Sequence, residues 1–350
     1  MKKFSLLIVL LGIFVVGCST DEPTPEPSKP SNGVPHNEIW YTSTDGNIVE
    51  PSLGASYDEE ASQMKSFGAN IISNTYEDGK GVITFDGDVK YITSAAFYKC
   101  STLNTITVPE CITEIGDATF CQCSNLTSID VPDSVTAIGQ QAFDNCDALE
   151  NVTIGKGVKS IGTTASFRCT SLTSITIPEN VTSFGTYPFG KCVNLEEFCG
   201  PYASENGKLL ICNGTLAGFA PKGMIECFIP DGVTTINAGA LAYGTELTYI
   251  TIPETVTTIG EDAFYGCSSL TELYFPANVS SIGSYSFAMT ANLQKVYFES
   301  VTPPTAVPNI WESWNAFDYT SAKIYVPSES LDAYKSAEHW SNYADRIKGF

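Results

Sequence analysis

Apolar residues recur along this chain with a period of 23. Each repeat starts with a leucine, such as Leu103, Leu126 or Leu149, and two further apolar positions follow three and five residues later. The first of these two positions forms a column through the chain, namely Ile83, Ile106, Ile129, Val152, Ile175, Phe198, Cys227, Ile250, Leu273, Val296 and Ile324. Apolar positions that alternate with polar ones predict short strands. A proline directly after many of them would end the strand, because it has no N–H to donate.

A unit of this size cannot bury its own apolar face, so neighbouring units must stack into a solenoid with one continuous core. The period lies in the range of about 20–29 residues typical of leucine-rich repeats. We therefore predict a leucine-rich-repeat solenoid, a right-handed superhelix of about eleven strand positions, or rungs, over residues 83–326. Short parallel strands would dominate it, joined by turns and short 3₁₀ or α segments.

One step in the column is longer than the others, since 29 residues separate Phe198 from Cys227. This segment contains two apolar runs around Asn213 and Gly214, a pair typical of two-residue hairpin turns. We predict a β-hairpin inserted between rungs at about residues 200–226.

Both ends of a solenoid need a cap, because an exposed end strand is a template for aggregation. Residues 36–82 contain short strand-like runs without the period, which predicts an N-terminal β cap. Residues 327–350 have apolar side chains at helical spacing, which predicts a C-terminal helical cap.

The N-terminal segment has the pattern of an export signal. Residues 1–17 place two lysines before a short apolar run, as in a secretory signal peptide. The following Cys18 resembles the lipid-acceptor cysteine of bacterial lipoproteins, with plain cleavage and no lipid as the alternative. Residues 18–35 are polar and proline-rich, which predicts a lipidated tether. Asp21 and Glu22 resemble the signal that sends lipoproteins of the Bacteroides group to the cell surface.

Composition excludes several functions. The chain has 39 acidic and 18 basic side chains and a formal net charge of −21, which argues against binding to nucleic acid. Its two histidines, His36 and His339, lie outside the repeats, so the repeats contain no histidine to act as the base of a Ser-His-Asp triad. We predict a monomer that is not an enzyme and that binds no metal and no cofactor.

Six cysteines share one column of the repeat, which predicts buried free thiols and no disulfide framework; they are Cys100, Cys123, Cys146, Cys169, Cys192 and Cys267. Besides Cys18, five more lie outside this column, at positions 111, 121, 199, 212 and 227. The sequence leaves open whether Cys212 and Cys227 form a disulfide.

The full unit closely resembles the BspA-like, treponemal-type leucine-rich repeats of bacterial surface proteins. One copy contains Ile138-Gly139, Ala142-Phe143, Cys146, Leu149, Val152 and Ile154. The chain departs from the pattern where Leu241 replaces phenylalanine and where Gly244 and Thr290 replace cysteine. The resemblance implies attachment to host matrix proteins or to other bacteria. It predicts a surface-exposed outer-membrane lipoprotein that acts as a binding or adhesion module.

Tyrosines occupy outward positions on the last rungs. Tyr274, Tyr297 and Tyr325 follow one column, and Tyr249 lies in the adjoining one. Such rings can stack on sugars or anchor a protein partner, so these four residues are the candidate ligand contacts. A glycan-capture lipoprotein beside an outer-membrane uptake system is the alternative function. The alternative structural role is aromatic packing between strands beneath the cap.

Overall fold

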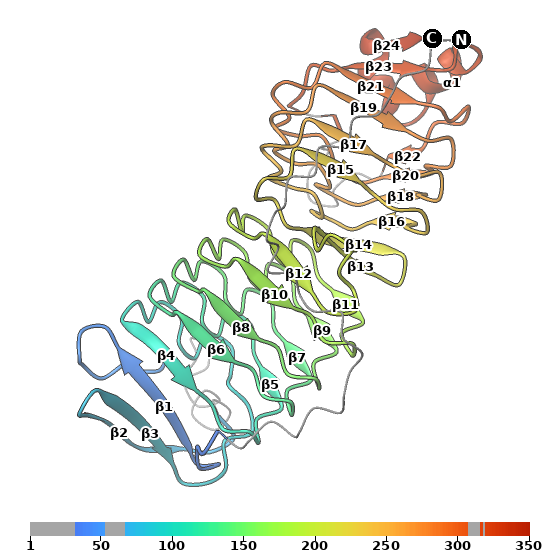
Figure 1. The fold of residues 1–350 in the computed structure, drawn as a ribbon. Helices are drawn as coiled ribbons and strands as arrows, with labels where there is room; N and C mark the ends of the chain where they lie inside the picture. Colours follow the sequence, from blue (N-terminus) through green and yellow to red (C-terminus); the bar gives the residue numbers. More distant parts are fainter. Residues whose placement is uncertain (1–31, 53–66, 307–315, 318) are drawn as a thin grey trace, which may run out of the picture. The chain divides into compact units, whose positions relative to one another are not determined.

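The computed structural model describes residues 32–52, 67–306, 316–317 and 319–350 (Figure 1). The predicted signal peptide, Cys18 and most of the predicted tether lie outside these residues. The described chain is a solenoid whose turns each contribute short parallel strands, and this confirms the predicted fold class.

The first ladder of strands carries the apolar column, with partners in register, so that Ile106 lies beside Ile129 and Leu273 beside Val296. Its strands are β4 (Leu103–Thr107), β6 (Ser128–Asp130), β8 (Asn151–Thr153), β10 (Ser174–Thr176), β12 (Glu197–Cys199), β15 (Glu226–Phe228), β17 (Tyr249–Thr251), β19 (Glu272–Phe275), β21 (Lys295–Phe298) and β23 (Lys323–Val326). The column residues of all these strands are buried.

A second ladder, which the sequence did not predict, forms at the part of the repeat that contains Val135, Ile138 and Gly139 in one copy. Its strands are β5 (Glu114–Ile115), β7 (Ala137–Ile138), β9 (Ser160–Ile161), β11 (Ser183–Phe184), β16 (Thr235–Ile236), β18 (Thr258–Ile259), β20 (Ser281–Ile282) and β22 (Thr305–Ala306). In most of these strands a glycine follows the last residue and permits close approach of neighbouring turns, whereas Asn237 follows β16. A Cβ at Gly139 would lie 2.5 Å from the carbonyl carbon of Gly116.

The core between the ladders is filled by side chains of the turns. Phe120 and Phe143 stack with their ring centroids 5.7 Å apart and their planes 1° apart. The thiol of Cys146 donates to the carbonyl oxygen of Phe120 at 3.1 Å, and that of Cys169 to Phe143 at 3.2 Å. Five of the six column cysteines are buried free thiols, as predicted, whereas Cys100 is only partly buried. Cys212 and Cys227 are both free, so the bridge left open between them is not formed.

The N-terminal part differs from the predicted boundary at residue 83. Here β1 (Glu38–Ser43), β2 (Ile71–Glu77) and β3 (Lys80–Phe85) form an antiparallel sheet, in which β1 lies between β3 and β4. The strand that contains Ile83 therefore pairs with β1 and not with the next rung. The reason is that an apolar period reports which side chains face the core, but not which strand lies alongside.

The segment predicted as a hairpin contains β13 (Leu209–Cys212) and β14 (Thr215–Phe219), which pair antiparallel. Positive φ angles of 50° at Asn213 and 74° at Gly214 make the tight turn between them. The hairpin continues the second ladder, because β14 pairs in parallel with β16.

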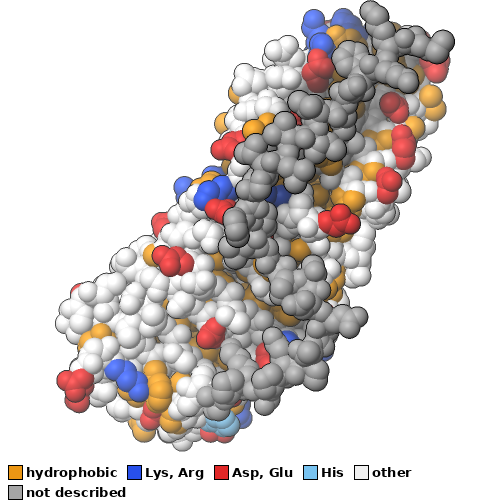
Figure 2. Space-filling model, in the orientation of Figure 1, with side chains coloured by type: hydrophobic (Ala, Val, Ile, Leu, Met, Phe, Trp, Pro, Cys, Tyr) orange, Lys and Arg blue, Asp and Glu red, His pale blue; other side chains and the backbone are white. Residues whose placement is uncertain are grey.

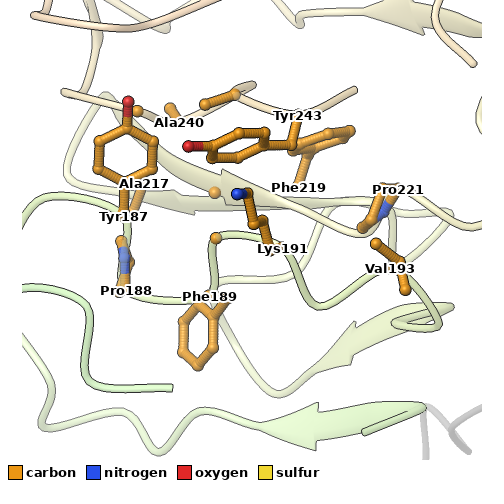
Figure 3. Close-up of a pocket in the computed structure, with 14 residues that line it drawn as sticks. Tyr187, Pro188, Phe189, Lys191, Val193, Ala217, Phe219, Pro221, Ala240 and Tyr243 are labelled. Carbon is orange, nitrogen blue, oxygen red and sulfur yellow. The ribbon is translucent and has the colours of Figure 1, made fainter. Parts of the chain in front are cut away.

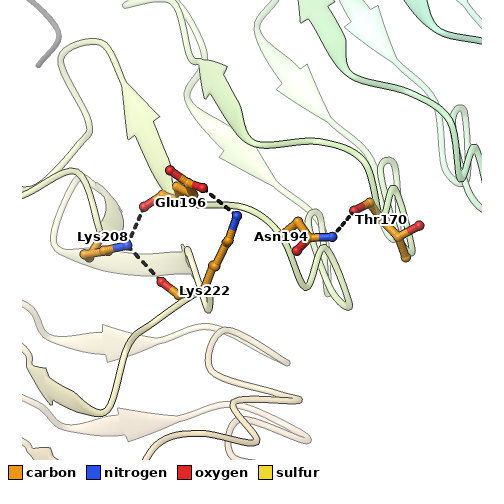
Figure 4. Close-up of polar contacts among 5 residues, drawn as sticks. All are labelled: Thr170, Asn194, Glu196, Lys208 and Lys222. Atoms are coloured by element: carbon orange, nitrogen blue, oxygen red, sulfur yellow. Dashed lines mark hydrogen bonds and ion pairs between the residues drawn. The ribbon is translucent and has the colours of Figure 1, made fainter. Parts of the chain in front are cut away.

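Three polar contacts hold the two sides of this insertion, two of them to Glu196 of the preceding rung and one between Lys208 and Lys222 (Figure 4). The ammonium of Lys208 donates to the carbonyl oxygens of Glu196 and Lys222, at 2.6 and 3.1 Å. Lys222 forms an ion pair with the carboxylate of Glu196 at 2.6 Å. Alongside, Asn194 donates from its side chain to the carbonyl oxygen of Thr170 at 2.8 Å, a contact that recurs between other turns at Asn125 and Asn292.

The C-terminal segment is less helical than predicted. It contains η1 (Ser328–Ser330), α1 (Leu331–Ser336), η2 (Trp340–Arg346) and β24 (Ile347–Gly349), and β24 extends the first ladder beside β23. The Trp340 indole donates to the carbonyl oxygen of Pro304 at 2.7 Å and covers the last turn. None of the helices in the described ranges has the length and apolar character needed to cross a bilayer.

Candidate functional site

The insertion brings together two turns that are far apart in the sequence. In regular turns a backbone N–H donates to the carbonyl of the next turn, as Thr164 does to Thr186 at 2.8 Å. The unit that contains the hairpin has no turn like that of Ala142, Phe143 and Cys146, the Ala-Phe-x-x-Cys part of the regular repeat. The N–H of Tyr187 therefore reaches across it to the carbonyl oxygen of Ala238, at 3.3 Å. The Asn237 side chain donates to the carbonyl oxygen of Gly185 at 3.1 Å, so the two turns are direct neighbours.

Each turn presents outward side chains from positions with positive φ, for instance 52° at Tyr187 and 65° at Tyr243. Gly239 and Gly266 occupy the same columns without a side chain. A Cβ at Gly239 would lie only 2.5 Å from the Tyr187 ring, and one at Gly266 would lie 3.3 Å from the Tyr243 ring. The two glycines thus let aromatic rings of the preceding turns lie over them.

These features produce a hollow of about 620 Å³, which we call the aromatic groove. Its lining residues are Thr164, Phe167, Tyr187, Tyr243, Glu261, Asp262, Tyr265, Tyr285, Met289 and Tyr319.

Phe167 lines this groove because its turn departs from the repeat. Ser166 takes the core position that Phe143 occupies in the turn before and is buried there. The aromatic residue of this turn is therefore one position later, at Phe167, and its ring lies at the surface instead of in the core. There it contacts Tyr187 and Tyr243 at centroid distances of 6.2 and 6.0 Å.

The rings of the groove are inclined to one another and form walls. The planes of Phe167 and Tyr187 lie at 87°, and those of Tyr243 and Tyr265 at 68° with centroids 5.4 Å apart. The chain places one of its own cations against these rings. The ammonium nitrogen of Lys191 lies 4.2 Å from the Tyr243 ring centroid and 5.5 Å from that of Phe167. Figure 3 shows Lys191 extending toward Tyr243, with Tyr187 nearby.

Charge in the groove is acidic and partly buried. Burial raises the pKa of Asp262 to about 6, although a hydrogen bond from the Tyr187 hydroxyl lowers it, and the negative charge of Glu261 adds to the rise. Burial also raises the pKa of the Tyr243 hydroxyl. Burial and then the charge of Arg168 lower the pKa of Lys191.

We expect Asp262→Asn to raise the melting temperature at neutral pH. A carboxyl whose pKa is higher in the folded state favours folding below its unfolded pKa of about 4, and this contribution is lost as the pH rises through the folded value. Asparagine has no charge to bury, so the gain in melting temperature should be largest near neutrality and should vanish below about pH 4. Thermal unfolding of wild type and variant across this range measures the difference. A variant that is less stable than wild type at neutral pH would contradict the assignment.

The structure brings together three of the four predicted ligand contacts. Tyr274 and Tyr297 stack with centroids 4.5 Å apart and planes at 1°, and Tyr297 and Tyr325 stack at 4.8 Å and 18°. Their faces therefore cover one another, an arrangement that fits packing between strands. Tyr249 lies apart from this stack and contacts Phe228 at 6.2 Å. A ligand-binding role for these four residues stays a prediction.

No group of three or more His, Cys, Asp or Glu side chains arranged for a metal ion occurs among the described residues. Acidic side chains stand at separate places on the face seen in Figure 2. The predictions of no enzymatic activity and no cofactor stay predictions.

The aromatic groove was not predicted from the sequence, although the sequence contains two signals for it. They are the exchange of Phe and Ser at positions 166 and 167, and the glycines in two outward columns. Both are departures from the repeat, and they meet only because the hairpin unit lacks a turn.

Comparison with known proteins identifies the repeat. The sequence model of the BspA type leucine-rich repeat region matches residues 79–202 and 218–323, in six copies. A leucine-rich cell surface protein from Faecalibacterium prausnitzii has a similar structure, with 21% identity, a TM-score of 0.52 and coverage of 75% of this chain and 79% of that one. A leucine-rich repeat protein from Eubacterium ventriosum is 24% identical, with a TM-score of 0.52 and coverage of 74% and 77%. No curated protein sequence matches the chain.

Proposed function

This chain belongs to the BspA-type leucine-rich repeat family, and we propose that it is a cell-surface module that attaches a bacterium to a protein partner. The observation that carries the proposal is the aromatic groove. Tyrosine and methionine are enriched at the centres of protein interfaces, and tyrosine is frequent among the residues that dominate binding energy. The groove exposes both types, since Tyr319 is 60% and Met289 is 54% exposed.

The family and the sequence pattern of the N-terminal segment support a surface location. The structurally similar Faecalibacterium protein is described as a cell surface protein. We propose that Cys18 carries the lipid anchor in the outer membrane and that residues 18–35 hold the solenoid away from the bilayer. An extended proline-rich chain of this length spans roughly 50 Å.

A protein partner is favoured over a glycan by the geometry of the rings. A sugar stacks on the open face of an aromatic ring, and the stacked column of Tyr274, Tyr297 and Tyr325 offers few such faces. The rings of the aromatic groove are inclined to one another and do not form a flat platform. Glycan capture is therefore the second candidate, and the experiment below separates the two.

We expect bacteria that produce the full chain to adhere to surfaces coated with host matrix proteins or with surface proteins of other bacteria. Protease digestion of the coat should abolish adhesion, whereas periodate oxidation of its glycans should not. Cys18→Ala should abolish adhesion of cells by releasing the protein, while Cys111→Ala, the same change at another cysteine, should leave it intact. Adhesion that survives protease and is lost after periodate would support glycan capture instead.

A further inference from the structure

We propose that the aromatic groove receives a lysine or arginine side chain from an exposed segment of the protein partner. This inference depends on the proposed function, because it specifies what that partner presents to the groove. It is carried by three observations on the described residues: the inclination of the rings, the position of Lys191 and the acidic lining.

The rings provide electron-rich faces around a common space. A cation within about 6 Å of a tyrosine or phenylalanine ring centroid is attracted by the ring quadrupole, and inclined rings let several faces act on one cation. The chain already uses this attraction, because the Lys191 ammonium lies 4.2 Å from the Tyr243 centroid. The groove extends from Tyr243 to Tyr265, Tyr285 and Tyr319, where further rings line the hollow.

The charge of the lining selects a cation over an anion or a neutral group. The two acidic residues that line the hollow are Glu261 and Asp262, and no lysine or arginine is among its lining residues. Lys191 lies against the Tyr243 ring but is not part of the lining. Burial and the like charge of Glu261 disfavour the ionised form of Asp262, although a hydrogen bond from the Tyr187 hydroxyl favours it. A bound cation would stabilise the ionised form of Asp262, since an opposite charge within about 4–6 Å favours the ionised carboxylate. The net charge of −21 attracts basic segments from a distance.

The apolar rim points to a side chain on a protein segment rather than to a free small cation. Met289 and Tyr319 stand at the hollow with more than half of their surface exposed. The stem of a lysine or arginine is apolar and packs along such surfaces while the charged head lies among the rings. The backbone around that residue would cover the rim, which choline or spermine would leave in water.

The test measures binding of the full chain to the peptide (Gly-Ser-Lys)₄-amide, labelled with rhodamine at its N-terminal amine, by fluorescence anisotropy. The wild type should bind this peptide and should not bind the version with glutamine in place of lysine. Tyr243→Ala, Tyr319→Ala and Asp262→Asn should each weaken binding by about tenfold. Lys191→Ala should tighten binding, because it removes the internal cation that competes for the Tyr243 ring.

Matched controls separate the groove from general charge attraction. Tyr98→Ala, at a tyrosine that is 37% exposed, and Asp231→Asn repeat two of the changes outside the groove and should leave binding unchanged. Lys335→Ala repeats the loss of a lysine charge and should tighten binding less than Lys191→Ala. Circular dichroism of each variant checks that it is folded.

Equal losses for Asp231→Asn and Asp262→Asn, or wild-type binding by both tyrosine variants, would overturn the inference. Choline or spermine that binds as tightly as the peptide would overturn the assignment to a protein segment. Groove variants that still adhere to protein-coated surfaces would overturn this inference and leave the proposed function standing. Adhesion that resists protease would overturn the proposed function as well.

Discussion

A rise from about pH 8 to about pH 10.5 should unfold this protein at room temperature, because its core contains thiols that cannot ionise while they are buried. Burial raises the pKa of Cys227 and Cys267 to about 12. It also raises the pKa of Cys123 and Cys146, and at Cys169 a hydrogen bond with Cys192 joins burial in raising the pKa further.

The loss of stability at high pH follows from proton linkage. Below about pH 8.5 the thiol is protonated in both states, and above it the unfolded chain loses protons that the folded chain retains. Each such thiol lowers the free energy of unfolding by about 1.4 kcal/mol per pH unit. Five of them together lower it by about 7 kcal/mol per unit, which is comparable with the whole stability of a typical domain.

Urea denaturation under reducing conditions at several pH values measures this slope. The double variant Cys146→Ala and Cys169→Ala should show a slope shallower by about 3 kcal/mol per pH unit, although it is less stable at neutral pH. The Cys111→Ala variant, at a partly exposed thiol whose pKa burial also raises, is the comparison and should change the slope less. Equal slopes in wild type and double variant would show that the buried thiols do not cause the alkaline loss.

Replacing Phe143 with alanine should lower the free energy of unfolding by about 3–5 kcal/mol. The ring is 1% exposed and stacks on Phe120 inside the turn. Its removal leaves a cavity that the backbone cannot close, because hydrogen bonds to both neighbouring turns fix its position. The N–H of Phe143 donates to the carbonyl of Ala165 at 2.7 Å, and that of Phe120 donates to Ala142 at 2.8 Å.

Tyr297→Ala is the matched control, because this ring also stacks between neighbours on adjacent turns but lies on the surface. We expect a loss of about 1 kcal/mol there, the size of an aromatic contact between strands. Chemical denaturation of both variants measures the two values. Similar losses at the two positions would contradict the assignment of Phe143 to the core and Tyr297 to the surface.

The sequence predicted the solenoid because its period is long and repeated. Ile106, Ile250 and Val296 are buried at the expected places, and the turn column carries buried cysteines such as Cys146 and Cys267. The second ladder could not be predicted in the same way, because its strands have two residues and show no alternation. The sequence also did not predict that β1 pairs with β4, because the apolar pattern does not show which strands become neighbours.

The aromatic groove depends on a contact that no local pattern contains. Tyr187 and Tyr243 are far apart in the sequence and meet because the hairpin unit contributes no turn between them. The tyrosine column at Tyr274 and Tyr297 could be predicted, because its members lie one period apart on adjacent strands. The faces of these tyrosine rings stack on one another, which the periodicity alone does not show.

The central claim is that the partner binds at the aromatic groove, and site-specific photo-crosslinking tests it most directly. The photoreactive residue p-benzoylphenylalanine replaces Tyr319 in one form of the chain and Tyr274 in another, and each form is irradiated with the protein that supports adhesion. We predict a covalent product from position 319 that disappears with excess lysine peptide, and little product from position 274. A product that forms from position 274 but not from position 319 would contradict the claim.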